Sequence, residues 1–172
     1  FRPEMLEGAE VVKKMTIDEK IAFWRDVMQM AKDRGIDVYL FTWNAFLFTE
    51  EGKHGLTREK PFGKMVDYFR ASVREMVNTY SLLAGMGVTA GENMKDFPSV
   101  ESKEQWTLQT YREGIRDALK TEPNRSFRLI HRLHSSKPDV VRQAWTNYPG
   151  PFNFSFKYAA VAHMYGVTNP CM

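Results

Sequence analysis

The residue best placed for chemistry is Glu92, which follows the apolar run from Leu82 to Val88. Gly85 and Gly87 within that run predict a strand that another group approaches closely, and Glu92 then lies just past its carboxyl end. A carboxyl group there can be partly desolvated, and desolvation favours the protonated form that a general acid needs. We therefore take Glu92 as the leading catalytic candidate, with local capping or pairing as the alternative.

Trp43 and Asn44 are candidates for substrate binding, because they end the strand-like run 37–42. The indole ring offers a platform for the apolar face of a sugar, and the amide can hydrogen-bond a hydroxyl group. The loop that follows is long for a connection between a strand and a helix, and such loops often carry function. A tryptophan buried in the core is the alternative.

Three basic side chains end two later strand-like runs. His131 ends the run 127–131 and Arg132 follows it, and Lys157 ends the run that begins at Phe152. The planar fork of Arg132 suits a carboxylate, His131 can donate or accept a hydrogen bond, and Lys157 can bind an anionic or hydroxyl-rich ligand. We interpret them as substrate-binding residues. A structural ion pair is the alternative for Lys157.

Metal and disulfide chemistry receive little support. His131 and His134 are three residues apart, so on a continuous strand they face opposite sides and cannot chelate one ion. The single cysteine, Cys171, cannot form an intramolecular disulfide. We therefore expect no metal and no cofactor.

Four units in which a helix precedes a strand must position these residues. The first helix opens with Thr16 and Glu19 in a capping-box pattern, and Gly35 follows it as a left-handed terminator. Apolar residues at helical spacing predict three more helices. The helices are expected at about 16–35, 62–79, 104–119 and 138–146, and the strands at 37–42, 82–88, 127–131 and 152–157.

Alternating helices and strands predict an α/β fold with a parallel sheet, because parallel neighbours cannot be joined by a hairpin. Two architectures compete at 172 residues. An open doubly wound sheet would be complete, whereas a (β/α)8 barrel would be about half present. The lack of a glycine-rich phosphate turn and the long polar loops after the strands favour the partial barrel, as one domain over 1–172.

The last strand-like run alternates strictly. Phe152, Phe154 and Phe156 fall on one side, and Asn153, Ser155 and Lys157 on the other. In a barrel the aromatic side would pack beneath the outer helices and the polar side would point to the axis.

The segments Phe41–Asn44, Gly85–Met94, Arg128–Arg132 and Phe154–Tyr158 together resemble successive strand ends of (β/α)8-barrel glycoside hydrolases, closest to bacterial polysaccharide-degrading enzymes of the α-glucuronidase kind. The resemblance implies a carbohydrate substrate, a general acid at Glu92, and sugar contacts from Trp43 and Asn44. It also implies that the rest of the barrel lies outside this chain. A bacterial periplasmic or secreted location would fit polysaccharide degradation.

Charge and hydropathy argue against two other classes of partner. The net charge is only +3, with 24 basic and 21 acidic residues interspersed, so binding to nucleic acid is not expected. No apolar stretch approaches the roughly 20 residues that span a bilayer, so no membrane segment is expected.

Several functional points stay open. Glycoside hydrolysis needs two carboxylates, and the second would come from strands beyond this chain or from Glu50 or Glu51. A carbohydrate-binding barrel without catalysis is one alternative function. A metal-dependent barrel hydrolase that uses His131, His134 and Glu92 is another.

Overall fold

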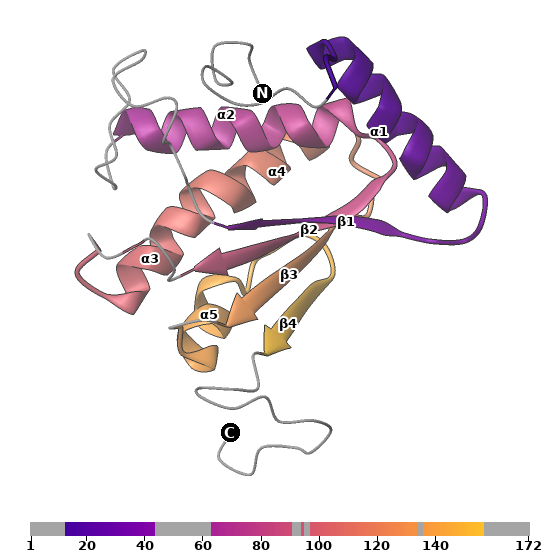
Figure 1. Cartoon of the computed structure of the whole chain (residues 1–172). Helices are drawn as coiled ribbons and strands as arrows, with labels where there is room; N and C mark the ends of the chain where they lie inside the picture. Colours follow the sequence, from indigo (N-terminus) through magenta and orange to yellow (C-terminus); the bar gives the residue numbers. More distant parts are fainter. Residues whose placement is uncertain (1–12, 44–62, 91–93, 95–96, 134–135, 157–172) are drawn as a thin grey trace, which may run out of the picture.

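The computed structural model describes residues 13–43, 63–90, 94, 97–133 and 136–156. These residues form an α/β fold in which helices gather on one side of a four-stranded sheet (Figure 1). The strands are β1 (Val38–Trp43), β2 (Leu83–Ala90), β3 (Arg128–Leu133) and β4 (Phe152–Phe156).

All strand pairs are parallel, and each strand pairs with the next along the chain, in the order β1-β2-β3-β4. The helices are α1 (Ile17–Lys32), α2 (Gly63–Thr79), α3 (Val100–Thr107), α4 (Glu113–Leu119) and α5 (Pro138–Ala144), with a π-helical turn, η3 (Leu108–Arg112), between α3 and α4. The α/β class and the parallel sheet predicted from the sequence are thus confirmed.

Helix α1 begins where its capping signal predicts. The Thr16 hydroxyl accepts a hydrogen bond from the Glu19 amide at 3.2 Å, and the Glu19 carboxylate accepts one from the Thr16 amide at 2.6 Å. Beyond the helix, Gly35 adopts a left-handed φ of 70°. Both ends of the first helix therefore follow local rules of side-chain and backbone geometry.

The third helical region differs from its prediction in two ways. It begins at Val100 rather than near Glu104, because Ser99 caps it through a reciprocal pair of hydrogen bonds with Ser102. It also contains the π turn η3, where one extra residue is accommodated between α3 and α4. Apolar periodicity alone does not reveal either feature.

The sheet has two different faces. The helix face carries side chains that pack into the core; its central members are Met86, Val88, Leu129, His131, Phe152 and Phe154. The residues between them point to the other side, which we call the polar face: Gly85, Gly87, Thr89, Arg128, Ile130, Arg132, Asn153 and Ser155. The predicted alternation of β4, with aromatic residues beneath the helices, is therefore confirmed at Phe152 and Phe154.

Aromatic rings fill much of the core beneath the helix face. Trp106 from α3, only 1% exposed, lies edge-on to Phe69, Phe97 and Tyr111 at ring-centroid distances of 5.3, 6.0 and 6.4 Å. Farther along the sheet, Trp145 stacks on Phe152 at 5.7 Å. Edge-on and stacked pairs of this kind add to the stability gained from burying the rings.

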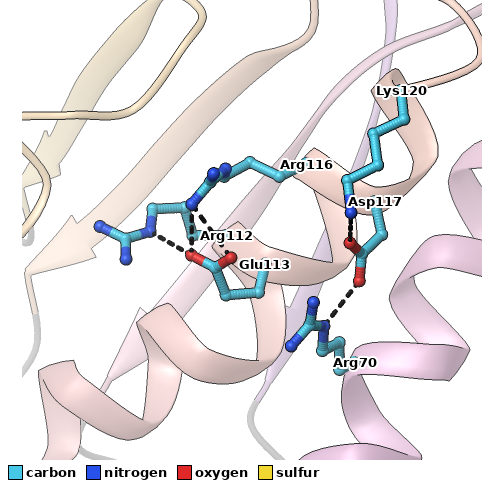
Figure 2. A network of polar contacts seen from close by, with 6 residues as sticks. All are labelled: Arg70, Arg112, Glu113, Arg116, Asp117 and Lys120. Carbon is cyan, nitrogen blue, oxygen red and sulfur yellow. Dashed lines mark hydrogen bonds and ion pairs between the residues drawn. The ribbon is translucent and has the colours of Figure 1, made fainter.

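Ion pairs tie the outer side of the helical layer together (Figure 2). Arg70 of α2 binds Asp117 of α4 at 2.6 Å, and Lys120 binds the same carboxylate at 2.7 Å. The hydrogen bond from Arg70, with Lys120 nearby, lowers the pKa of Asp117 to about 2. This contact joins α2 to α4.

None of the helices in the described ranges is long and apolar enough to cross a membrane.

Candidate functional site

A row of residues crosses the polar face near the carboxyl end of the sheet. Trp43 pairs with Thr89, Thr89 with Arg132, and Arg132 with Ser155. Paired residues of a parallel sheet lie side by side, so the row joins all four strands at one level. The structure thereby brings together the strand positions of two predicted binding residues, Trp43 and Arg132.

Three other predicted residues follow this edge in the sequence. Strands β1, β2 and β4 end at Trp43, Ala90 and Phe156. Asn44 and Lys157 come one residue after the ends of β1 and β4, and Glu92 comes two residues after the end of β2. All three lie outside the described residues, as does the side chain of Trp43. Their roles therefore stay predictions, made for the edge at which all parallel strands of the sheet end.

Arg132 differs from the other arginines near the sheet. Arg128 donates to the Asn153 side chain at 2.6 Å, and Arg125 donates to the carbonyl oxygens of Tyr80 and Leu83 at 2.7 and 3.1 Å. The half-buried Arg132 side chain makes no hydrogen bond or ion pair with another described residue. Among the described residues, therefore, none occupies the donors of its guanidinium group.

His131 lies on the opposite face of the sheet from Arg132. Its side chain is 0% exposed, and it packs among core residues that include Trp145 and Phe152. Adjacent strand residues point in opposite directions, so a strand that presents Arg132 on the polar face must bury His131 beneath the helices. The structure thus separates two residues that the sequence interpretation had grouped as substrate contacts.

His131 belongs to a buried polar cluster centred on Glu104 of α3. One carboxylate oxygen, Oε2, lies 2.9 Å from His131 Nε2 and accepts a hydrogen bond from Trp145 Nε1 at 3.1 Å. The other, Oε1, accepts one from the Ser136 hydroxyl at 3.0 Å. Glu104 is only 1% exposed. Sequence reasoning missed it, although a signal exists: Glu104 occupies the same helix stripe as Leu108, Tyr111 and Ile115.

A second polar contact joins the same helical region to β1. Tyr111 of η3 is 3% exposed, and its phenol group hydrogen-bonds the Thr42 side chain. Burial raises the pKa of Tyr111 to about 12. Thr42 directly precedes Trp43, so this contact fixes the backbone beside a predicted sugar-binding residue.

An aromatic ring also occupies the polar face. The ring of Phe41 fills the space that a side chain at Gly87 would take, and a side chain at Gly85 would meet the backbone of Arg128. Both glycines therefore permit close approach, as the sequence predicted. Phe41 remains 56% exposed, so its ring is open to contact on this face.

Within the described ranges, no three His, Cys, Asp or Glu side chains form a group that could hold a metal ion. His134 and Glu92, the other ligands of the metal-dependent alternative, lie outside those ranges. His131 Nε2 is already paired with Glu104.

No family model and no curated protein matches the sequence. Among solved structures the fold is similar to that of a protein described as a "GH138 enzyme targeting pectin rhamnogalacturonan II", with a TM-score of 0.72 and 22% sequence identity. The match covers 86% of this chain and 18% of that chain, so this chain spans less than a fifth of the similar protein. The similarity establishes a shared fold for this region.

Proposed function

We propose that this chain is part of a glycoside hydrolase that acts on a polysaccharide by general acid and base catalysis. The observation that carries the proposal is the row Trp43, Thr89, Arg132 and Ser155, which lies at or one residue before the carboxyl end of each strand. The predicted acid Glu92 follows Thr89 by three residues. A parallel α/β sheet places its chemistry at this edge. The fold shared with an enzyme that targets pectin supports the choice of a carbohydrate substrate.

In this proposal Glu92 protonates the leaving oxygen of the glycosidic bond. Trp43 and Asn44 contact the sugar ring and its hydroxyl groups. Arg132 and Lys157 bind hydroxyl groups or the carboxylate of a uronic acid, which makes a uronate-containing chain the favoured substrate. His131 has no place in this binding set, because its side chain is enclosed beneath the helices.

We also propose that the sheet continues into a larger (β/α)8 barrel. The two outer strands, β1 and β4, each have one edge without a partner strand among the described residues. Several apolar side chains of α1 and β1 are exposed, and additional strand–helix units would cover them: Ile17, Phe23, Trp24, Met30, Leu40 and Phe41. The second carboxylate would come from such a unit or from Glu50 or Glu51. A separation of about 5–5.5 Å from Glu92 would predict retention, and about 6.5–9.5 Å inversion.

The test is hydrolysis of pectic polysaccharide by the full-length protein carrying Glu92→Gln. The substitution removes the proton donor and little volume, so we expect turnover to fall by about two to four orders of magnitude with substrate affinity nearly unchanged. Release of reducing ends measures turnover, and calorimetry measures affinity. Glu101→Gln, an equivalent change at an exposed position of α3, is the matched control and should leave both quantities unchanged.

Unchanged turnover in Glu92→Gln would remove Glu92 from the role of acid. Saturable binding of the polysaccharide by the wild-type protein, without any bond cleavage, would instead identify a carbohydrate-binding barrel without catalysis.

A further inference from the structure

The carboxylate of Glu104 contacts one residue before and one residue after Arg132 in the sequence. His131 directly precedes Arg132 and lies 2.9 Å from Oε2, whereas Ser136, four residues after Arg132, donates to Oε1 at 3.0 Å. One side chain from α3 therefore holds two residues that flank Arg132 in the sequence.

The same carboxylate extends this anchor to the neighbouring helix. Trp145, directly after α5, donates to Oε2 at 3.1 Å, and its ring lies edge-on to that of His131 at a centroid distance of 6.0 Å. Glu104, His131 and Trp145 are each no more than 2% exposed. Hydrogen bonds are directional and are stronger in a buried site than in water, so this cluster is a rigid support rather than a surface contact.

Arg132 points away from this support, onto the polar face between Thr89 and Ser155. No other described side chain holds its guanidinium group by a hydrogen bond or an ion pair. The backbone of Arg132 in β3 is held from the opposite face, where Glu104 binds the side chain of the preceding residue, His131, and also that of Ser136.

We propose that Glu104 is a positioning residue for Arg132, and that it sets how strongly Arg132 discriminates a sugar carboxylate from a neutral group. The inference rests on the proposed carbohydrate site, but it concerns recognition rather than bond cleavage. It assigns the buried cluster a role in substrate specificity in addition to its contribution to stability.

The test compares binding of acidic and neutral sugars to the full-length protein. Galacturonate and glucuronate are the acidic probes, and galactose and glucose are their neutral counterparts. The readout is the affinity for each acid divided by the affinity for its neutral counterpart. We expect Arg132→Ala to abolish the preference for the acid. Glu104→Gln and Ser136→Ala should lower the ratio by about three- to tenfold, because a misplaced guanidinium loses part of a charge-assisted hydrogen bond.

Tyr148→Phe provides the matched control for loss of stability alone. Tyr148 donates a buried hydrogen bond of 2.7 Å to the carbonyl oxygen of Phe127, at the amino end of the same strand β3. Its removal should lower the melting temperature without changing the affinity ratio.

In the Arg132→Ala background, Glu104→Gln should have no further effect on the ratio. Ser136→Ala removes only one hydrogen bond, so it serves as the readout when Glu104→Gln does not fold.

Two results would overturn the inference. One is an affinity ratio in Ser136→Ala and Glu104→Gln that equals the wild-type ratio, with only the melting temperature lowered. The other is a wild-type protein that binds acidic and neutral sugars equally. A protein that prefers the acid and loses this preference in these variants, but cleaves no glycosidic bond, would support the inference and contradict the proposed hydrolase.

Discussion

The two faces of the sheet carry different kinds of side chain. On the helix face, Met86, Val88 and Leu129 are almost completely buried, and even the polar residue His131 is enclosed and partnered. On the polar face, glycine, arginine, serine and asparagine replace these side chains, and Arg132 keeps its donors unpaired among the described residues. Strand residues alternate between the faces, so each strand contributes to both.

Stability and recognition are thus divided between neighbouring residues. His131 and Arg132 are adjacent in sequence, yet one is locked to Glu104 in the core and the other faces the predicted site. A substitution on the helix face is therefore expected to act mainly on folding. A substitution at the next residue, on the polar face, is expected to act mainly on ligand binding. The following predictions test how complete this division is.

The largest effect on stability is expected at Leu129, which is 0% exposed on the helix face. Leu129→Ala should lower the free energy of unfolding by about 2–5 kcal/mol, because it leaves a cavity in the core. Ile130→Ala, at the next position on the polar face, is the matched control and should cost less, since Ile130 is only half-buried. Chemical denaturation measures both values, and equal costs would contradict the division.

A smaller effect is expected where the polar face is closely packed. Gly85→Ala and Gly87→Ala should each cost about 1–3 kcal/mol through steric overlap. The overlap at Gly87 is with the ring of Phe41, whereas that at Gly85 is with the backbone of Arg128.

Adding Phe41→Ala should therefore relieve the defect of Gly87→Ala and leave that of Gly85→Ala in place. Melting temperatures of the single and double variants measure the coupling. Equal relief of both defects would show that the ring of Phe41 is not the obstacle at Gly87.

Tyr111→Phe should lower the free energy of unfolding by about 1 kcal/mol, because it removes a buried hydrogen bond to Thr42. The pKa of Tyr111 is raised to about 12 from 10.0, so the unfolded chain releases this proton first as the pH rises. The contribution is complete below pH 10 and is lost between pH 10 and 12. The stability difference between wild type and variant should shrink across this window. A constant difference would contradict the burial of the phenol.

The smallest effect is expected at the ion pair outside the core. Asp117→Asn should cost about 1 kcal/mol or less at neutral pH, since the side chains of Arg70 and Lys120 are 41% and 70% exposed and water screens the pairs. The pKa of Asp117 is lowered to about 2 from 3.8, so its stabilising effect is complete above pH 4 and is lost as the pH falls toward 2. Acid unfolding curves of wild type and variant should therefore converge near pH 2. Curves that still differ at pH 2 would show that Asp117→Asn lowers stability through packing rather than through loss of the ion pairs.

Local chemical signals predicted much of the fold. The Thr16–Glu19 capping box, the left-handed Gly35 and the alternation at Phe152 and Phe154 are all present as expected. These features depend on residues close together in the sequence, which is why the sequence alone reveals them. The parallel pairing of the strands followed from the alternation of helices and strands.

The site was predicted less completely, because its geometry depends on contacts distant in sequence. The Glu104–His131 pair joins residues 27 positions apart, and nothing local to His131 indicates that a carboxylate from α3 meets it. The sequence interpretation selected His131 for its chemistry, whereas strand alternation decides which face it occupies. The roles of Glu92, Asn44 and Lys157 stay predictions.

The π turn η3 has a consequence for how this chain will align with related proteins. It accommodates one extra residue between Leu108 and Arg112, and in a regular helix each residue turns the following side chains by about 100°. A homologue with an uninterrupted helix here should show a one-residue gap in this segment. Without that gap, an alignment would place every later residue of the helix one position out of phase and match core residues to surface ones.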